Sequence, residues 1–475
     1  MKSQRQIVRG GSPASVSQRQ TTIPKLHWLW FGLFAVTLAF LGGSSWPDPI
    51  HHALLRPVVA LLLIPVLSQL RMKDIQRAQV PFLLLLLLLI WMVLQLVPLP
   101  PAVWQTLPDR QGLAELDYLA GLNDVWRPIS LTPFRGLNAA FGMVVPLTAL
   151  LLALAMRIPA RALLLVVFGI GVFDAALVLL QVVGGSESPF YLFPNPSPGA
   201  AEGIFANENH SAVFSAIVML IVARLALETS IAKDPSWLRL SYAPAFVLVL
   251  LAVLVSGSRA GLAVTLVVLL ASAGMIWLET RDRAADFDGR HGATLWRTRG
   301  RLALAGCAAA ILLLIAAFAW LERTPAFEDI INAGSFDDLR WSLLPILGDV
   351  AATHWLLGTG FGSFEAVYHA YEPTELLLPL YVNQAHNDWA QLAIEGGAPA
   401  VVLLAGFLWW FGKAVLGLRA SRQARAGQII FWTACVAIIA AASVVDYPLR
   451  TPVFQAVAVW LLLCLSADRA KTIGV

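Results

Sequence analysis

Charged side chains are scarce in this sequence. Of its 475 residues, 13% are Asp, Glu, Lys or Arg, about half the share that is usual in soluble proteins. Hydrophobic residues make up 58%, and the mean hydropathy is +0.72. A chain with so few charges cannot cover the surface of a soluble globule with polar side chains, which argues against a soluble fold.

Cysteine is also scarce, with only three in the chain, and each falls within an apolar run: Cys307, Cys435 and Cys464. Their spacing matches neither a metal-binding nor a redox motif. We interpret them as small buried apolar residues, and we expect no disulfide.

Long apolar runs take the place of the missing charges. A transmembrane helix needs roughly 20 such residues in a row, and scanning for such runs predicts an all-α polytopic membrane protein. About twelve spans are predicted, near 27–43, 53–70, 80–99, 136–156, 162–183, 210–227, 241–256, 260–278, 302–321, 390–412, 427–445 and 451–466. The boundary between the seventh and eighth is marked only by Ser256–Arg259.

The distribution of basic residues predicts the orientation, because cytoplasmic loops hold an excess of Lys and Arg. With the N-terminus inside, all lysines and most arginines fall on the inner side. Both termini are then cytoplasmic. The predicted regions are a cytoplasmic tail, nine spans, a large periplasmic loop, three spans and a second cytoplasmic tail, at 1–26, 27–321, 322–389, 390–466 and 467–475. The basic loops lack the interleaved aromatics that stack on bases, so we expect no binding to nucleic acid.

The predicted loop 322–389 is the longest exterior segment. Within it, Leu339–Trp355 has the apolar spacing of a short amphipathic helix. The following Gly358–Gly362 has glycine at every second position, which indicates a turn. This pattern is weak evidence for a nucleotide site, because no strand precedes it and the segment is predicted to face outward.

Polar residues at the predicted outer edge of the membrane are the candidates for chemistry, because ionisable groups there are costly. One cluster is Gln384–Asp388, followed by Gln391 and Glu395 on one helix face. His386 has the chemistry of a general base. The alternative is a capped helix start, with Asn387 or Asp388 as the N-cap.

Arginines form the second group of candidates. Arg259 lies in a short connector between two apolar runs, where its guanidinium suits phosphate oxygens; lipid-headgroup snorkelling is the alternative. Arg340 begins the amphipathic helix and could instead pair with Asp337 or Asp338. Arg450 could likewise close its short loop by an ion pair with Asp446.

A third cluster lies before the sixth predicted span, where Phe205 is followed by Asn207, Glu208, Asn209 and His210. These polar side chains can bind sugar hydroxyls or a phosphate. Considered alone, helix capping is the better interpretation of the two asparagines.

Taken in order, these elements resemble the O-antigen ligase and polymerase family. The resemblance rests on Arg340-Trp341, on Gly358 to Phe364, on His386-Asn387 with Gln391 and Glu395-Gly396, and on the upstream elements Asn207 to His210 and Ser258 to Gly261. These matches run from about 203 to 397.

The resemblance implies an inner-membrane glycosyltransferase whose active site faces the periplasm and needs no cofactor or metal. The donor would be a glycan on undecaprenyl pyrophosphate, and the acceptor either the lipid A core or another lipid-linked glycan. His386 would be the general base, with Arg259 and Arg340 stabilising the leaving group and inversion at the reacting carbon. Further substrate contacts are expected from Asn207, Asn209, His210, Asn387, Gln391 and Arg450.

Several interpretations of the function stay open at this point, among them a scaffold subunit of an envelope polysaccharide complex, which would not need an outward set of His and Arg. A ligase and a repeat-unit polymerase share these motifs, and exopolysaccharide assembly belongs with the second. A transporter of the same lipid-linked glycan is a different class. The spans hold few ionisable residues, which argues against ion-coupled transport.

Overall fold

The computed structural model describes residues 24–46, 50–194, 200–228, 235–286, 336–377, 382–419 and 426–473, together with 298, 300–302, 304–306, 308–312 and 316. Within these ranges the side chains of some helical residues, Arg259 and Arg340 among them, lie outside the description. The described chain is helical and contains no strand, only one isolated bridge between Leu99 and Arg127.

The helices before the middle of the chain are α1 (Lys25–Leu41), α2 (Ile50–Leu61), α3 (Ile64–Gln69), α4 (Met72–Gln76), α5 (Gln79–Leu94), α6 (Pro101–Trp104), α7 (Gln111–Leu119), α8 (Pro133–Gly142), α9 (Val144–Ala155) and α10 (Ala160–Gly184). Those that follow are α11 (Glu208–Glu228), α12 (Ser236–Val255), α13 (Arg259–Asp286), α16 (Phe336–Thr353), α17 (Phe364–Tyr371), α18 (Asp388–Arg419), α19 (Ala426–Val445) and α20 (Pro452–Ile473). Short 3-10 turns are η1 (Gly185–Glu187), η2 (Thr374–Leu376) and η3 (Pro448–Arg450).

Nine helical segments of the described chain are long and apolar enough to cross a membrane, so this is a polytopic α-helical membrane protein. They are Ile50–Gln69, Pro133–Ala155, Ala160–Glu187, Glu208–Glu228, Ser236–Val255, Ala260–Asp282, Asp388–Leu418, Ala426–Val445 and Pro452–Ala470. Two further predicted spans correspond to the shorter apolar helices α1 and α5, and most of 302–321 lies outside the described residues. The count of twelve therefore stays a prediction.

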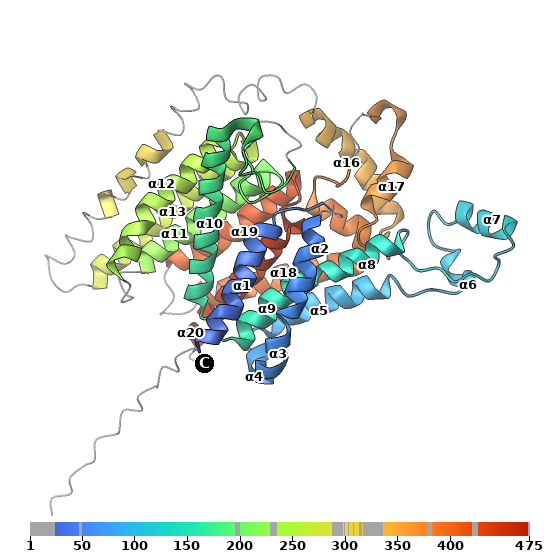
Figure 1. Cartoon of the computed structure of the whole chain (residues 1–475), viewed down its shortest axis with the longest axis horizontal. Coiled ribbons are helices and arrows are strands. Elements are labelled where there is room, and N and C mark those ends of the chain that lie inside the picture. The colour runs from blue at the N-terminus through green and yellow to red at the C-terminus, as the bar shows by residue number, and fades with distance from the viewer. Residues whose placement is uncertain are drawn as a thin grey trace, which may run out of the picture.

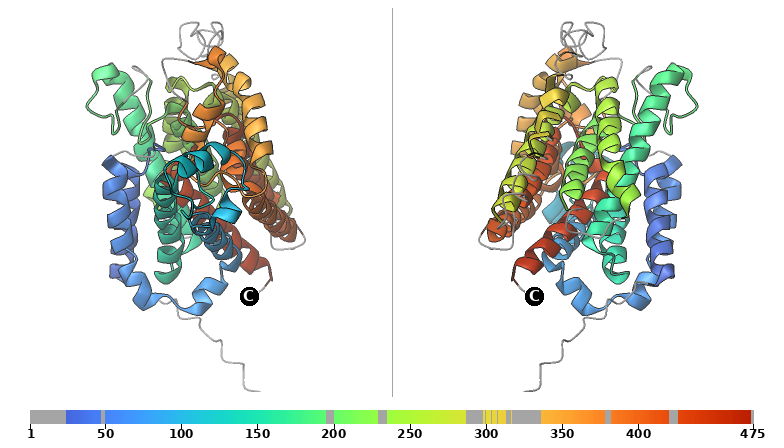
Figure 2. Two further views of the ribbon diagram at one scale, coloured as in Figure 1. Left: turned by 90° about the vertical axis from the view of Figure 1, so that its right-hand side faces the viewer. Right: turned by 90° about the vertical axis from the view of Figure 1, so that its left-hand side faces the viewer.

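The helices form one bundle around α11, which packs against α10, α12, α13 and α19. In Figure 1, α11, α12 and α13 lie on one side of α18, α19 and α20, and α2, α5, α8 and α9 lie on the other; the two side views of Figure 2 agree. Helices α16 and α17 cover one end of the bundle, next to the N-terminal end of α18, while α6 and α7 project beyond it.

Helix α11 is the most deeply buried span, with 89% of its apolar window inside the protein. Its neighbours approach closely because they carry small residues. A Cβ at Gly171 of α10 would overlap the side chain of Val218, and one at Gly261 of α13 would overlap Ala212. Small residues let membrane helices pack where no hydrophobic force drives them together.

One charged side chain, that of Arg224, is buried within this helix packing. Arg224 of α11 donates to Asp468 of α20 at 2.7 Å and to Glu228 at 2.8 Å. Its guanidinium also stacks on the rings of Phe431 and Trp432. A buried charge is tolerated only when it is paired in this way, so Arg224 ties α11 to α19 and α20.

The Gly358–Gly362 segment is a turn, as predicted, and its backbone donates hydrogen bonds to α18. That helix is interrupted at Gly397, whose φ is +59°. The carbonyl groups released there accept hydrogen bonds from the backbone N–H of Thr359 (to Ile394, 2.9 Å) and of Gly360 (to Glu395, 3.0 Å). A broken membrane helix must have its carbonyls satisfied by protein. The glycine segment therefore satisfies the carbonyl groups that the break in α18 leaves open.

Two side chains, one in α5 and one just after it, donate further hydrogen bonds to carbonyl groups around this break. Gln95, just after the helix, donates to the carbonyls of Leu357 and Glu395, both at 2.9 Å, and Trp91 donates to that of Gly396 at 2.7 Å. The first half of α18, which carries the candidate base at its start, is thus fixed against α5 and the glycine turn.

Candidate functional site

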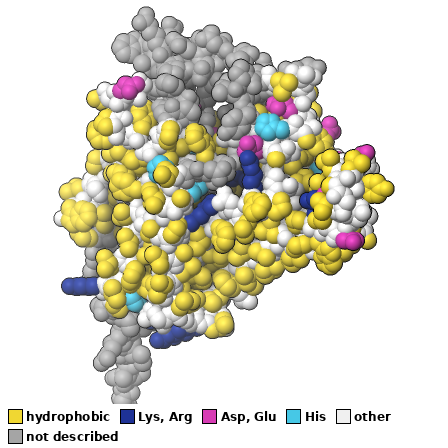
Figure 3. Space-filling view, turned by 45° about the vertical axis from the view of Figure 1, so that its right-hand side comes forward, with side chains coloured by type: hydrophobic (Ala, Val, Ile, Leu, Met, Phe, Trp, Pro, Cys, Tyr) yellow, Lys and Arg dark blue, Asp and Glu magenta, His cyan; other side chains and the backbone are white. Residues whose placement is uncertain are grey.

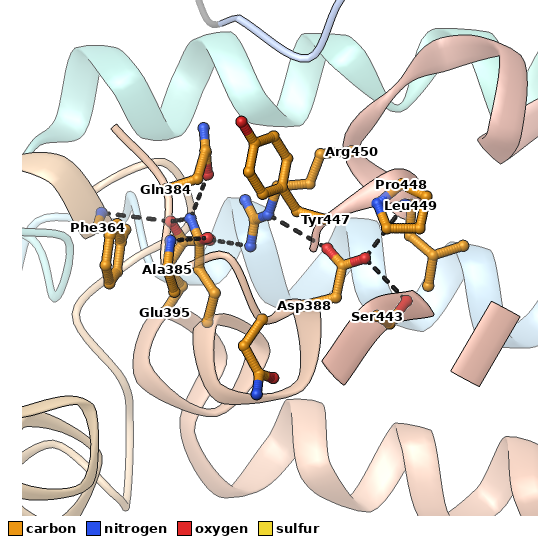
Figure 4. Close-up of polar contacts among 12 residues, drawn as sticks. Phe364, Gln384, Ala385, Asp388, Glu395, Ser443, Tyr447, Pro448, Leu449 and Arg450 are labelled. Carbon is orange, nitrogen blue, oxygen red and sulfur yellow. Dashed lines mark hydrogen bonds and ion pairs between the residues drawn. The ribbon is translucent and has the colours of Figure 1, made fainter. Parts of the chain in front are cut away.

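The site is built where the start of α18 meets the connector between α19 and α20. Asp388 accepts hydrogen bonds from Ser443 Oγ at 3.0 Å and from the N–H of Leu449 at 3.2 Å. The guanidinium of Arg450 lies between two carboxylates of α18, with Nη2 3.1 Å from Glu395 Oε2 and Nε 3.6 Å from Asp388 Oδ1 (Figure 4). The ion pairs of Arg450 therefore run to α18 rather than to Asp446, the partner considered from the sequence.

A buried amide network holds the segment that precedes His386. Gln391 Nε2 donates to Gln384 Oε1 at 2.6 Å and to Glu395 Oε1 at 3.1 Å, while its Oε1 accepts from the N–H of Ala385 at 3.0 Å. Gln391 is almost fully buried. These contacts hold the loop that carries His386, and the substrate contact expected of Gln391 stays a prediction.

His386 is held in an unusual conformation for a residue with a side chain. Its φ is +47°, in the left-handed region that costs a non-glycine residue free energy. Its Nδ1 lies 3.9 Å from Asp446 Oδ1, and its ring contacts the edge or face of Tyr447 at 5.0 Å between centroids. The side chain is 29% exposed, so a substrate can reach it.

Asp446 also contacts a second histidine. His210, in the first turn of α11, has its Nε2 3.5 Å from Asp446 Oδ1 and its ring 5.3 Å from that of Tyr447. Unlike His386, it is 1% exposed. The structure therefore brings together two of the predicted site residues through a carboxylate, and it gives His386 the accessible position.

Asn207 caps α11, as the capping interpretation predicts, whereas Asn209 lies in the first turn of the helix. Asn207 Oδ1 accepts from the N–H of Asn209 at 2.8 Å. Asn209 Oδ1 in turn accepts from Ser258 Oγ at 2.7 Å, and Ser258 Oγ also accepts from the N–H of Gly261 at 2.9 Å. The starts of α11 and α13 are joined by these bonds, which brings the backbone of Arg259 to the same end of the bundle as His210.

Asn387 caps α18, because its Oδ1 accepts from the N–H of Ala390 at 2.9 Å. Arg340 belongs to α16, the predicted amphipathic helix, whose apolar face packs against Ile394 of α18 through a cluster including Leu343 and Leu347. The side chains of Arg259, Arg340, Asp337 and Asp338 lie outside the description, so their proposed contacts stay predictions.

A cavity of about 340 Å³ adjoins the start of α18 on the side of α2, α5 and α8. Three arginines line it, Arg56 of α2, Arg135 of α8 and Arg450 of η3, together with Gln384, Asp388 and Glu395 and an apolar wall that includes Leu88, Met92 and Phe361. Of these arginines, only Arg450 was singled out as a site residue from the sequence. The others are separated from it by more than 300 residues, and no local pattern marks them.

No group of three or more His, Cys, Asp or Glu side chains with the geometry of a metal site occurs among the described residues. Cys435 and Cys464 are buried between helices, as predicted, and Cys307 is outside the described part.

The bundle and its polar end define a multi-pass membrane protein with a candidate enzymatic site at the start of α18. Residues 244–405 match the family model described as O-antigen ligase, which confirms the resemblance to the O-antigen ligase and polymerase family. The match begins in α12 and ends in α18, so it covers Arg259, Arg340 and His386. No curated protein matches the chain.

Proposed function

We propose that this protein transfers a glycan from undecaprenyl pyrophosphate to an acceptor hydroxyl at the periplasmic face of the inner membrane. The lipid A core is the proposed acceptor, as in an O-antigen ligase. The observation that carries the proposal is the position of His386, which is partly exposed, close to the Asp446 carboxylate and at the start of the helix that ends the O-antigen ligase match.

In the proposed reaction His386 accepts the proton of the acceptor hydroxyl, and the Asp446 carboxylate stabilises the imidazolium that forms. The acceptor oxygen then bonds to the anomeric carbon of the donor. The bond from that carbon to the pyrophosphate oxygen breaks, and undecaprenyl pyrophosphate leaves with the electron pair. Direct displacement of this kind inverts the configuration at the anomeric carbon.

Arg259 and Arg340 are the proposed ligands of the leaving pyrophosphate. Arginine suits this role, because its fork of N–H donors matches phosphate oxygens and stays charged at any physiological pH. Preorganised cations stabilise the charge that develops on a leaving group. Asn209 holds the start of α11 beside that of α13 through its bond to Ser258, so we assign it the positioning of Arg259.

The test is transfer by purified protein, with undecaprenyl-pyrophosphate-linked glycan as donor and two acceptors offered separately: a lipid A core and a second lipid-linked repeat unit. We expect product with the first acceptor and none for His386→Ala. His369→Ala is a matched control, because that histidine lies on the exposed face of α17, paired with Glu372.

Product formed only with the second acceptor would identify a repeat-unit polymerase. Normal transfer by His386→Ala would refute the assignment of the base. Movement of intact donor across proteoliposomes without any transfer would instead favour the transporter.

A further inference from the structure

We infer that the cavity lined by Arg56, Arg135 and Arg450 is a second anion site, which binds a phosphate group of the acceptor glycolipid. This inference rests on the proposed function, because it assigns one of the two substrates of that reaction to a place. The evidence is the composition of the cavity, the way its arginines are held, and its position relative to His386.

The three arginines come from separate parts of the chain and line one cavity of about 340 Å³. A volume of this size is within the range of small-molecule sites, roughly 300–1,000 Å³. Basic side chains in such a space are costly unless an anion or a fixed partner compensates them. Figure 3 shows the charged and histidine side chains of this face among a mostly hydrophobic surface.

Each guanidinium is oriented by a side chain from another helix. Arg56 donates to Asn138 of α8, and Arg135 donates to Glu365 of α17. Arg450 is held by Glu395 and Asp388, yet its buried Nε makes no hydrogen bond. Because a guanidinium has five N–H donors, a single carboxylate cannot occupy all of them. These partners therefore hold the three arginines in place at the lining of the cavity.

The surroundings strengthen these charges. Leu55, Leu88, Met92 and Phe361 form apolar walls beside the arginines. Electrostatic attraction is stronger next to such walls than in water, since the local dielectric constant is lower. Arginine forks bind phosphate with two parallel hydrogen bonds, so a phosphate monoester is the group that this lining suits best.

The position of the cavity distinguishes acceptor from donor. Gln384, Asp388 and Trp389, which flank His386 in the chain, line the cavity together with residues of α2, α5 and α8. The start of α13, with Arg259, lies toward the other side of α18, beside α11. Transfer requires the two substrates to meet at the base from different directions. With the donor pyrophosphate assigned to Arg259 and Arg340, the arginine cavity is left for the acceptor.

The test measures equilibrium binding to the purified full-length protein in detergent, independently of transfer. The probes are a bisphosphorylated disaccharide glycolipid, the same glycolipid after enzymatic removal of its phosphates, and undecaprenyl pyrophosphate. The variants are Arg56→Gln and Arg56→Lys, with Arg77→Gln as control, because Arg77 is a 66% exposed arginine at the end of α4, outside the cavity. Melting curves establish that each variant is folded.

We expect Arg56→Gln to weaken binding of the bisphosphorylated glycolipid by about tenfold or more, since it loses a hydrogen bond to a charged group. Arg77→Gln should retain that affinity. Arg56→Lys should lose less of it than Arg56→Gln, because lysine keeps the charge but not the fork of donors, and binding of undecaprenyl pyrophosphate should not change. Unaltered binding of the phosphorylated probe by Arg56→Gln would overturn the inference. A loss confined to undecaprenyl pyrophosphate would also overturn it, by placing the donor in the cavity.

If Arg56→Gln does not fold, the unmodified protein still provides the test: equal affinity for the glycolipid with and without phosphates refutes the site. Failure of the proposed function would be seen in the transfer assay and not in these binding measurements. His386→Ala should bind all three probes normally, so an absence of transfer leaves these binding results intact.

Discussion

The carboxylate of Asp446 lies 3.9 Å from Nδ1 of His386, in the connector between the last two spans. The same oxygen accepts the N–H of Tyr447 at 2.9 Å and lies 3.5 Å from His210 Nε2. In the proposed reaction this carboxylate faces the imidazolium that His386 forms after it has removed a proton.

Replacement of these two residues should affect transfer to different extents. We expect His386→Ala to lower the rate by about 10²- to 10⁴-fold, the usual contribution of a general base. Asp446→Asn keeps the shape but loses the charge, and should lower it by roughly tenfold to a hundredfold. Rates are measured with purified protein under single-turnover conditions, with His369→Ala as control. Equal rates for Asp446→Asn and the unmodified protein would mean that Asp446 only closes the connector.

The glycine turn gives a prediction about stability. Gly358 has a φ of +72°, and a Cβ there would overlap the carbonyl group of Glu395. Gly358→Ala should therefore destabilise the folded protein by about 1–3 kcal/mol or more, seen as a lower apparent melting temperature in detergent. Gly348→Ala in α16 is the matched control, because a Cβ there meets nothing within 4 Å and alanine favours the helix. Similar melting temperatures for both variants would show that the two segments separate easily.

The ion pairs of Arg224 should matter far more than those of an exposed arginine. Arg224→Ala leaves the buried carboxylate of Asp468 without its cation, at a cost of about 3–5 kcal/mol. By contrast, Arg77 is 66% exposed and 3.8 Å from Asp74, so Arg77→Ala should cost about 1 kcal/mol or less. The comparison is made on the amount of folded protein in membranes and on its melting temperature. A loss no larger for Arg224→Ala would contradict the interior role of this residue.

Glu202, in the segment before α11, gives a pH dependence. Its carboxyl group is buried without a hydrogen bond, and burial, with repulsion from Glu208, raises its pKa to about 9. The unfolded chain releases this proton near the ordinary value of 4.5, whereas the folded protein keeps it until about pH 9. Folding stability must therefore fall as the pH rises through this window.

Glu202→Gln removes the titrating proton and keeps the shape. We expect its melting temperature to fall less than that of the unmodified protein between pH 6 and pH 8. Both pH values lie between the ordinary pKa of 4.5 and the raised pKa of about 9. Glu115→Gln on the exposed face of α7 serves as control, with a pH dependence like that of the unmodified protein. Parallel curves for Glu202→Gln and the unmodified protein would show that Glu202 ionises in the folded state.

The sequence alone determined the class of protein and most of its helices. Apolar runs of about 20 residues cannot be accommodated outside a bilayer or a deep core, so α10 to α13 and α18 to α20 follow from composition. The break between α12 and α13 was visible as Ser256–Arg259 for the same local reason: polar and glycine residues interrupt an apolar run. The family motifs are local as well, which is why the match to O-antigen ligase agrees with them.

The partners of the polar residues were decided by the tertiary structure alone. Arg450 looked paired with Asp446 four residues away, yet its ion pairs are with α18, and Asp446 contacts two histidines from distant helices. The sequence predicted the glycine turn, but the hydrogen bonds from this turn to the interrupted helix α18 depend on a tertiary contact. Arg56 and Arg135 face one cavity only because α2 and α8 pack beside α18. Side-chain pairing of this kind is set by which helices become neighbours, and hydrophobic periodicity within one helix carries no information about that.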